Sequence, residues 1–200
     1  MKENKKQYVY KLTVASIFIA LATVLSLIKI FSVPLGGSVT LLSMLPIIML
    51  PFMLGFKWGI GCSFVYSVIQ LLLGITLDGL LGWGLTPVML IGTIMLDYIL
   101  AFTVLGLAGI FQRKGTVGMV LGTSAVILLR FLCHFISGVV IFKQLEQFEL
   151  FGKLFSGRPA LYSLCYNGLY MLPELVITVI VAAIVFNLPQ IKKLMRSQSI

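Results

Sequence analysis

Three ionisable residues lie inside apolar stretches of this sequence. Arg130 and His134, the single histidine of the chain, are four residues apart in one stretch, and Asp97 interrupts another. Placing an ionisable side chain in the hydrocarbon of a membrane costs roughly 2.5–3.5 kcal/mol, so such residues usually mark a site for a ligand or an ion. The sequence therefore predicts a polar site inside a small helical membrane protein. A structural ion pair is the alternative, above all for Arg130.

The composition excludes an ordinary soluble domain, because 60% of the 200 residues are hydrophobic, 10% are charged and the mean hydropathy is +1.10. The first apolar stretch, 8–31, is too long for the core of a cleavable signal, so we expect it to be the first helix of the mature protein. Cys62, Cys133 and Cys165 fall within apolar stretches and have no metal-ligand spacing. We therefore expect neither a metal nor a cofactor.

The apolar stretches predict an all-α integral membrane protein, a single domain over 1–200 with six transmembrane helices. These helices are expected at about 8–31, 41–55, 58–76, 88–111, 116–142 and 160–188. The second is short and carries Pro46 and Pro51, so we expect an irregular helix that its neighbours cover. Pro173 should bend the sixth.

Lys and Arg are distributed unevenly between the two sides of this arrangement. The side of both termini has ten: Lys2, Lys5, Lys6, Lys11, Lys57, Arg113, Lys114, Lys192, Lys193 and Arg196. The opposite side has four: Lys29, Lys143, Lys153 and Arg158. The positive-inside rule then places both termini in the cytoplasm. The net charge of +9 thus reflects topology, and no soluble basic face with interleaved aromatic residues indicates a nucleic-acid partner.

Polar residues of three predicted helices reach a similar depth in the outer half of the membrane. Arg130, His134 and Gly138 are spaced by four and share one face of the fifth helix. The others are Asp97 and Tyr98 on the fourth helix, with Tyr162 and Asn167 on the sixth. This set suits a small aromatic ligand that carries an amino group or a positive charge. For any single tyrosine, an interfacial aromatic belt is the alternative.

The predicted outer loops, at about 32–40, 77–87 and 143–159, are longer than the inner turns. Loops of this kind can cover a binding site that opens to the outside. Glu174 lies seven residues after Asn167. The sequence leaves open whether Glu174 faces the same cavity or pairs with another helix, so we do not assign it to the site.

Several blocks of this chain, in order along it, carry a family resemblance. They are LTVASIFIALATVLS, GGSVTLLSMLPI, LDYILAF, RFLCHFISGVVIF and YSLCYNGLYMLP. With these blocks the chain resembles, over nearly its whole length, the substrate-binding S components of energy-coupling factor (ECF) vitamin transporters, specifically the thiamine-specific ThiT family. The resemblance implies a six-helix substrate-binding bundle in the plasma membrane of a prokaryote.

The resemblance also implies ligand contacts. The family's acidic residue and following tyrosine match Asp97 and Tyr98, although many members carry Glu at the acidic position. Its other contacts match His134, Gly138, Tyr162 and Asn167. A family tryptophan that stacks on the ligand aligns near Phe142, so stacking is weaker here or is supplied by Trp83. We expect Arg130 to support the site by orienting Asp97 or a backbone carbonyl.

The implied partners are thiamine, membrane lipid, a transmembrane coupling subunit and two cytoplasmic ATPases. On the first helix, Ser16 and Ala20 match the small residues, four apart, that dock the coupling subunit; ordinary helix packing is the alternative. The chain contains no G-x-x-x-x-G-K-[ST] phosphate-binding loop, so we expect ATP hydrolysis in the partners. The chain would capture thiamine outside, topple in the membrane and release it inside.

Three other functions remain open at this point. The chain could be an S component for another heterocyclic vitamin, such as riboflavin. A self-sufficient secondary transporter often shows an internal repeat, and the two halves of this chain do not match. An intramembrane enzyme would need an activated nucleophile, and the candidate hydroxyls of Ser137 and Ser163 have no activating sequence context.

Overall fold

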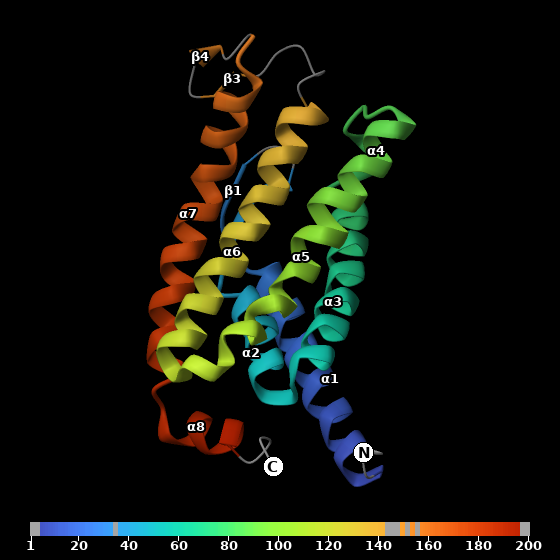
Figure 1. Ribbon diagram of the computed structural model, residues 1–200. Helices are drawn as coiled ribbons and strands as arrows, with labels where there is room; N and C mark the ends of the chain where they lie inside the picture. The colour runs from blue at the N-terminus through green and yellow to red at the C-terminus, as the bar shows by residue number, and fades with distance from the viewer. Residues whose placement is uncertain (1–4, 34–35, 143–148, 151–152, 155–156, 197–200) are drawn as a thin grey trace.

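The long apolar stretches form helices that pack side by side in a computed structural model, which describes residues 5–33, 36–142, 149–150, 153–154 and 157–196 (Figure 1). Five helical segments of this part of the chain are long and apolar enough to cross a membrane. They are α1 (Lys5–Leu27), α3 (Phe56–Thr76), the composite segment Pro87–Phe111, α6 (Gly115–Val140) and α7 (Pro159–Val185). By length and composition these helices indicate a multi-pass membrane protein.

The predicted second helix is present as α2 (Met44–Leu54), with Pro51 inside it. All eleven of its residues are buried, as expected for an irregular segment that other helices cover. Eleven residues of α-helix extend about 16 Å, roughly half the thickness of the hydrocarbon core. α2 alone is therefore too short to cross a membrane, and the count of six spans stays a prediction.

The composite fourth helix changes from α-helical to π-helical geometry in the segment that contains Asp97 and Tyr98. It consists of α4 (Pro87–Thr93), a π-helical segment η3 (Ile94–Leu100), α5 (Ala101–Thr103) and a 3₁₀ segment η4 (Val104–Lys114). The Thr86 hydroxyl accepts a hydrogen bond from the Met89 amide at 3.4 Å, which caps the start of α4. π-Helical turns are rare and frequently mark functional sites. Asp97 and Tyr98 lie within this one.

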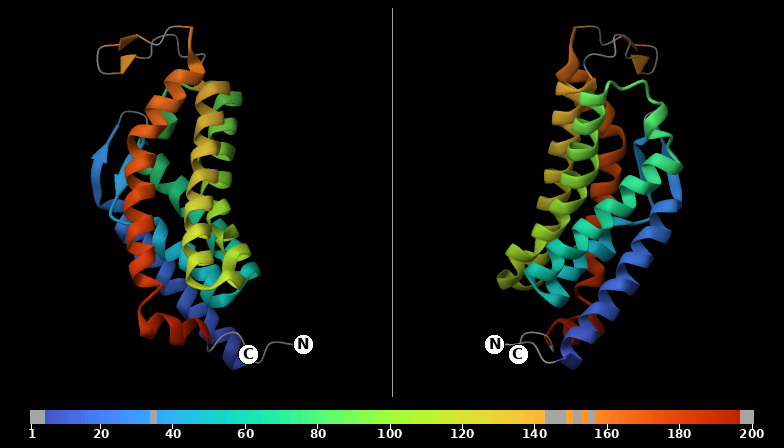
Figure 2. Two further views of the ribbon diagram at one scale, coloured as in Figure 1. Left: turned by 60° about the vertical axis from the view of Figure 1, so that its left-hand side comes forward. Right: turned by 90° about the vertical axis from the view of Figure 1, so that its right-hand side faces the viewer.

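The helices form an all-α bundle, as predicted, and two short hairpins join some of them. β1 (Lys29–Ser32) pairs antiparallel with β2 (Ser38–Thr40), and β3 (Glu149–Leu150) pairs with β4 (Lys153–Leu154). The first predicted helix, 8–31, therefore ends at Leu27, since the residues that follow pair with β2. Most of the predicted loop 32–40 belongs to the first hairpin, whose β2 packs against α7 (Figure 2).

Two shorter helices complete the described chain, η2 (Leu80–Gly82) and α8 (Pro189–Arg196). The sequence patterns did not predict α8. Within the predicted outer loop 143–159, residues 143–148, 151–152 and 155–156 lie outside the described residues. α7 continues through Pro173 as a single helix to Val185.

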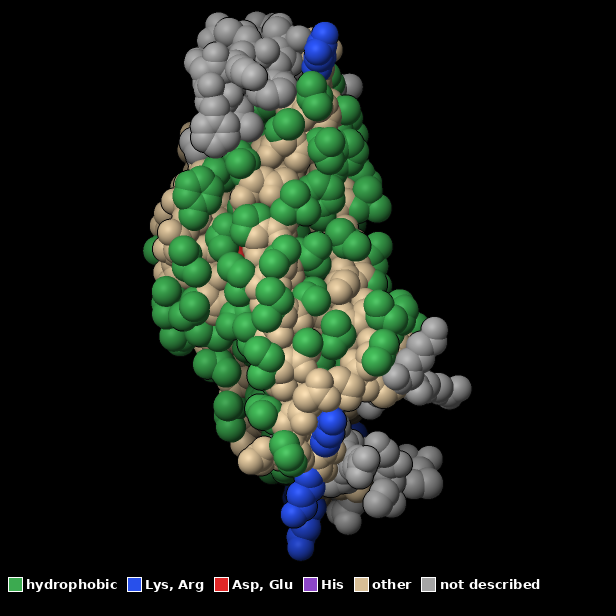
Figure 3. Space-filling view, turned by 90° about the vertical axis from the view of Figure 1, so that its left-hand side faces the viewer, with side chains coloured by type: hydrophobic (Ala, Val, Ile, Leu, Met, Phe, Trp, Pro, Cys, Tyr) green, Lys and Arg blue, Asp and Glu red, His purple; other side chains and the backbone are tan. Residues whose placement is uncertain are grey.

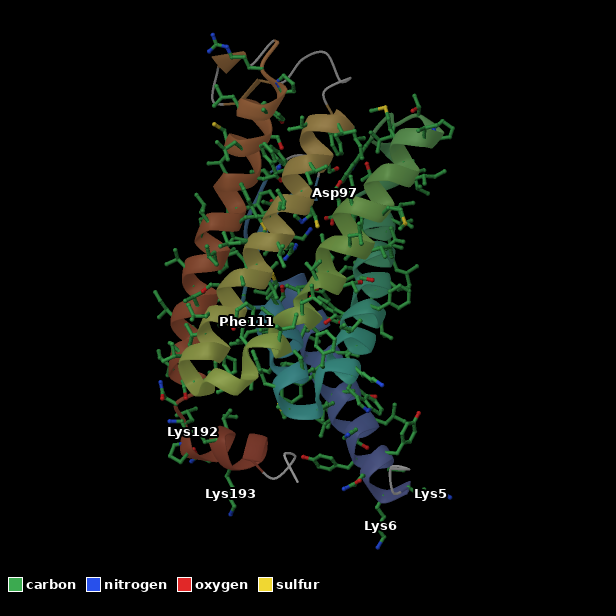
Figure 4. The ribbon with its side chains drawn as sticks, in the orientation of Figure 1. Lys5, Lys6, Asp97, Phe111, Lys192 and Lys193 are labelled. Carbon is green, nitrogen blue, oxygen red and sulfur yellow. The ribbon has the colours of Figure 1, made fainter. Side chains whose placement is uncertain are left out.

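Both ends of the described chain lie at the same end of the helix bundle. The start of α1, with Lys5 and Lys6, is at the same end as α8, with Lys192 and Lys193 (Figure 4). Hydrophobic side chains cover the middle of the face drawn in Figure 3, with Lys and Arg near its ends. This is the distribution expected of a surface that contacts lipid. The side of the membrane that holds the lysines stays a prediction.

Candidate functional site

A cavity of about 120 Å³ lies between the first hairpin, the end of α3, η3, α6 and α7. One water molecule needs roughly 10–15 Å³, so the cavity has room for a small organic molecule. It brings together every residue that the sequence assigns to ligand binding or support: Trp83, Asp97, Tyr98, Arg130, His134, Gly138, Phe142, Tyr162 and Asn167. Asp97 lies in the half of the bundle away from the labelled lysines (Figure 4).

Two helices present the cavity wall with a spacing of four residues, which keeps side chains on one face of an α-helix. On α6 the series is Arg130, His134 and Gly138, and Phe142 follows four residues later, just past the end of the helix at Val140. On α7 it is Tyr162, Tyr166, Tyr170 and Glu174, with Ser163 and Asn167 beside it. The backbone periodicity alone therefore places these groups in a common wall.

Asp97 joins η3 to α6 through two hydrogen bonds. His134 Nδ1 lies 2.8 Å from one carboxylate oxygen, and the Ser137 hydroxyl donates to the other at 2.5 Å. Ser137 is fully buried, whereas the Asp97 and His134 side chains retain 15% and 10% exposure. The carboxylate is thus held by α6 while it still faces the cavity.

Arg130 fixes the tautomer of the imidazole. Its Nε donates to His134 Nε2 at 3.3 Å, so Nδ1 carries the imidazole proton and donates it to Asp97. One Arg130 amino nitrogen contacts Met44 Sδ at 2.7 Å, and the guanidinium carbon lies 4.1 Å from the centre of the Phe102 ring. Arg130 therefore reaches Asp97 only through His134, and its supporting role in the site stays a prediction.

The Asn167 amide links α6 to α7. Its nitrogen donates to the Ser163 and His134 carbonyls at 2.9 and 3.3 Å, and its oxygen accepts from the Tyr170 hydroxyl at 2.6 Å. Gly138 permits this close packing, because a Cβ atom there would collide with the Ser163 hydroxyl. One accepting position on the Asn167 oxygen remains for a ligand.

Aromatic rings cover two parts of the cavity. The Tyr162 and Tyr166 rings stack with centroids 5.7 Å apart, and Tyr170 meets Tyr166 edge-on at 5.9 Å. At the mouth of the cavity, the centroids of the Trp83 and Phe142 rings lie 6.4 Å apart. The two residues that the sequence offered for stacking on the ligand are therefore neighbours.

Tyr98 is buried against α3 at Gly74, where a Cβ atom would collide with the Tyr98 hydroxyl. Its ring lines the cavity. Gly74 of α3 thus leaves the space that the Tyr98 phenol occupies.

The structure adds residues that the sequence did not assign. Glu174 lines the cavity, is 3% exposed and accepts hydrogen bonds from the Thr40 amide and hydroxyl, both at 2.7 Å. Its spacing of four from Tyr170 was the available signal. Lys29 of β1 forms an ion pair with Asp78 across the mouth, a contact between distant segments that no local pattern indicates.

Neither of the two candidate hydroxyls pairs with the histidine. The Ser137 hydroxyl donates to Asp97, and the Ser163 hydroxyl donates to the Phe135 carbonyl at 2.8 Å, so neither is hydrogen-bonded to His134. Within the described residues, no group of three or more His, Cys, Asp or Glu side chains is arranged to hold a metal ion.

Ser16 and Ala20 lie on the exposed side of α1, whereas Ala15, Ala22 and Ser26 of this helix are buried. The docking role of Ser16 and Ala20 stays a prediction.

Comparisons with known proteins match this arrangement over nearly the whole chain. The thiamine transporter ThiT of Bacillus subtilis (strain 168) is 32% identical over 198 residues, which cover 92% of this chain and 93% of that protein. A solved structure of ThiT from Listeria monocytogenes shares the fold, with a TM-score of 0.71 at 21% identity, covering 96% of this chain and 99% of that one. The family model described as thiamine transporter protein (Thia_YuaJ) matches residues 12–193, and the chain belongs to this family.

Proposed function

We propose that this chain is the thiamine-binding S component of an ECF-type importer. The observation that carries the proposal is the single cavity that gathers nine residues assigned from the sequence, within a chain of the thiamine transporter family. Its carboxylates, imidazole, amide and phenols match a small aromatic cation with an amino group. The proposal includes six spans, with the short α2 as the second, and both termini in the cytoplasm, so that the cavity lies in the outer half of the membrane.

Each ligand contact has a chemical role. The Asp97 carboxylate accepts from the amino group of the pyrimidine ring, or balances the thiazolium charge, through lone pairs that His134 and Ser137 leave free. Asn167 hydrogen-bonds the heterocycle through the free accepting position of its oxygen. Both ring nitrogens of His134 are engaged by Asp97 and Arg130, so His134 presents its ring to the cavity and orients Asp97. Tyr98 and Tyr162 add hydroxyl groups and ring faces.

The mouth of the cavity supplies stacking. Trp83 and Phe142 form an aromatic pair there, and their faces attract a cationic ring by roughly 0.5–2 kcal/mol each. This pair fills the role of the single tryptophan that the family resemblance implies.

Energy for transport comes from outside this chain. Two cytoplasmic ATPases and a transmembrane coupling subunit complete the importer, and the coupling subunit docks on the exposed Ser16 and Ala20 of α1. The S component captures thiamine outside, topples in the membrane and releases the vitamin to the cytoplasm.

Intrinsic fluorescence tests the ligand assignment, because the two tryptophans of the chain lie in different surroundings. Trp83 lines the cavity, whereas Trp58 of α3 packs on Tyr8 of α1 with ring centroids 5.5 Å apart. Thiamine added to the detergent-purified protein should quench fluorescence saturably. The quench should persist in Trp58→Phe and disappear in Trp83→Phe, with riboflavin as the control ligand. Quenching by riboflavin with none by thiamine would instead support an S component for that vitamin.

Uptake tests the importer assignment against a secondary transporter. Thiamine should accumulate in ATP-loaded vesicles that contain this chain with the coupling subunit and ATPases, and should not accumulate with this chain alone. Accumulation with the chain alone, driven by an ion gradient, would contradict the proposed dependence on partners.

A further inference from the structure

The described side chains that line the cavity carry a net negative charge. Lys29 and Arg130 are cationic, and Asp78, Asp97 and Glu174 are carboxylates. His134 is neutral in this arrangement, since its Nε2 accepts a hydrogen bond from Arg130. The lining therefore has a formal charge of −1, which one monovalent cation would neutralise.

Two of the three carboxylates differ in their links to the cations of the lining. Asp78 forms a direct ion pair with Lys29 at the mouth, where both side chains are partly exposed. Asp97 is linked to Arg130 through the neutral His134 ring.

Glu174 is different. Among the described residues, no Lys, Arg or His nitrogen lies within 4 Å of its carboxylate, so Arg130 acts on it only at a distance, and its two hydrogen bonds come from the neutral donors of Thr40. Each carboxylate oxygen accepts one of these bonds, as an ionised carboxylate does. A buried charge without a partner is costly, so an ion that neutralises it is bound more tightly than an uncharged molecule of the same shape.

We propose that Glu174 supplies the counter-charge by which the cavity selects a ligand with one positive charge. The inference rests on the proposed function, in which the ligand is thiamine and the charge is that of its thiazolium ring. Glu174 acts as a specificity-determining residue, while Asp97 and Asn167 recognise the neutral hydrogen-bonding edge of the ligand.

Glu174→Gln removes the charge while retaining the shape and both contacts of the side chain. The amide oxygen can accept from the Thr40 backbone amide. The amide nitrogen can donate to the Thr40 hydroxyl, which then donates to Ser43, whose hydroxyl lies 2.6 Å away. The link between β2 and α7 is thereby preserved.

The test compares two ligands by calorimetry on the purified protein. One is thiamine, and the other is its deaza analogue, in which a carbon atom replaces the charged ring nitrogen. Glu174→Gln should weaken thiamine binding about 30-fold, equivalent to about 2 kcal/mol, and should change binding of the uncharged analogue less than about twofold. Thermal unfolding of ligand-free Glu174→Gln is the control, and its unfolding temperature should stay close to that of the unmodified protein, because both contacts to Thr40 are retained.

Each other outcome contradicts the inference in a distinct way. An equal loss for both ligands would show that Glu174 acts by holding Thr40, and unchanged thiamine affinity would show that its charge is not used. The unmodified protein gives a test that is independent of the folding of the variant: it should bind thiamine about 30-fold more tightly than the analogue, and equal affinities would overturn the inference. Absence of thiamine binding to the unmodified protein would overturn the proposed function as well.

Discussion

Replacing Asp97 with Asn tests how the carboxylate of the π-helical segment takes part in binding. The substituted amide can still accept from His134 Nδ1 and donate to the Ser137 hydroxyl, the two groups at 2.8 and 2.5 Å from the present carboxylate. What is lost is the negative charge. A hydrogen bond to a charged group contributes about 1.5–3 kcal/mol, against about 0.5–1.5 kcal/mol for a neutral pair.

The expected magnitude follows from one such bond to the ligand. Weakening the contact with the pyrimidine amino group by about 1.4 kcal/mol lowers affinity about tenfold. The uncharged deaza analogue carries the same amino group, so its affinity should fall about tenfold, and that of thiamine at least as much. This response differs from that of Glu174→Gln, which should spare the analogue.

Calorimetric titration of Asp97→Asn with both ligands measures the effect, and thermal unfolding of the ligand-free variant checks that the bundle is intact. Asp97→Glu is the matched variant that keeps the charge on a side chain longer by one methylene, so it should retain more affinity than Asn. Unchanged affinity of Asp97→Asn for both ligands would refute the reasoning and remove Asp97 from the site.

Three further predictions concern packing and docking. Gly138→Ala should destabilise the protein by about 1–3 kcal/mol, because the new methyl group collides with the Ser163 hydroxyl. Thermal unfolding should show a partial recovery of stability when Ser163→Ala is added. No recovery would contradict this contact. Gly74→Ala should displace the Tyr98 phenol and weaken thiamine binding by about tenfold, whereas Gly61→Ala on the same helix, where a Cβ meets nothing within 4 Å, should not; calorimetry distinguishes them. Ala20→Leu should preserve thiamine binding but abolish ATP-dependent uptake with the coupling subunit, and undiminished uptake would exclude this face of α1 as the docking surface.

The sequence was most informative where site residues recur every four positions and so share one face of a helix. The spacing of Arg130, His134 and Gly138 on α6 predicted a shared wall, and these residues line one cavity. Five apolar stretches were long enough to be recognised from composition, and each corresponds to a spanning helix within a few residues. The grouping of Asp97 with His134 was also accessible, since opposite helix directions place both in the same half of the membrane.

Contacts between distant segments could not be predicted in this way. Hydrophobic periodicity does not distinguish the start of β1 from the end of α1, so the first helix was extended over residues that pair with β2. Glu174 continues the four-residue series of α7, but only its bonds to Thr40 show that it faces the cavity. The π-helical winding at Asp97 likewise has no local sequence signature and depends on the packing of the fourth helix against α3 and α6.

Calorimetric titration of the purified, unmodified chain with thiamine tests the central claim most directly. The account predicts one thiamine bound per chain with submicromolar affinity, and no binding of riboflavin under the same conditions. No heat of binding at several temperatures, together with an unchanged unfolding temperature in excess thiamine, would contradict it.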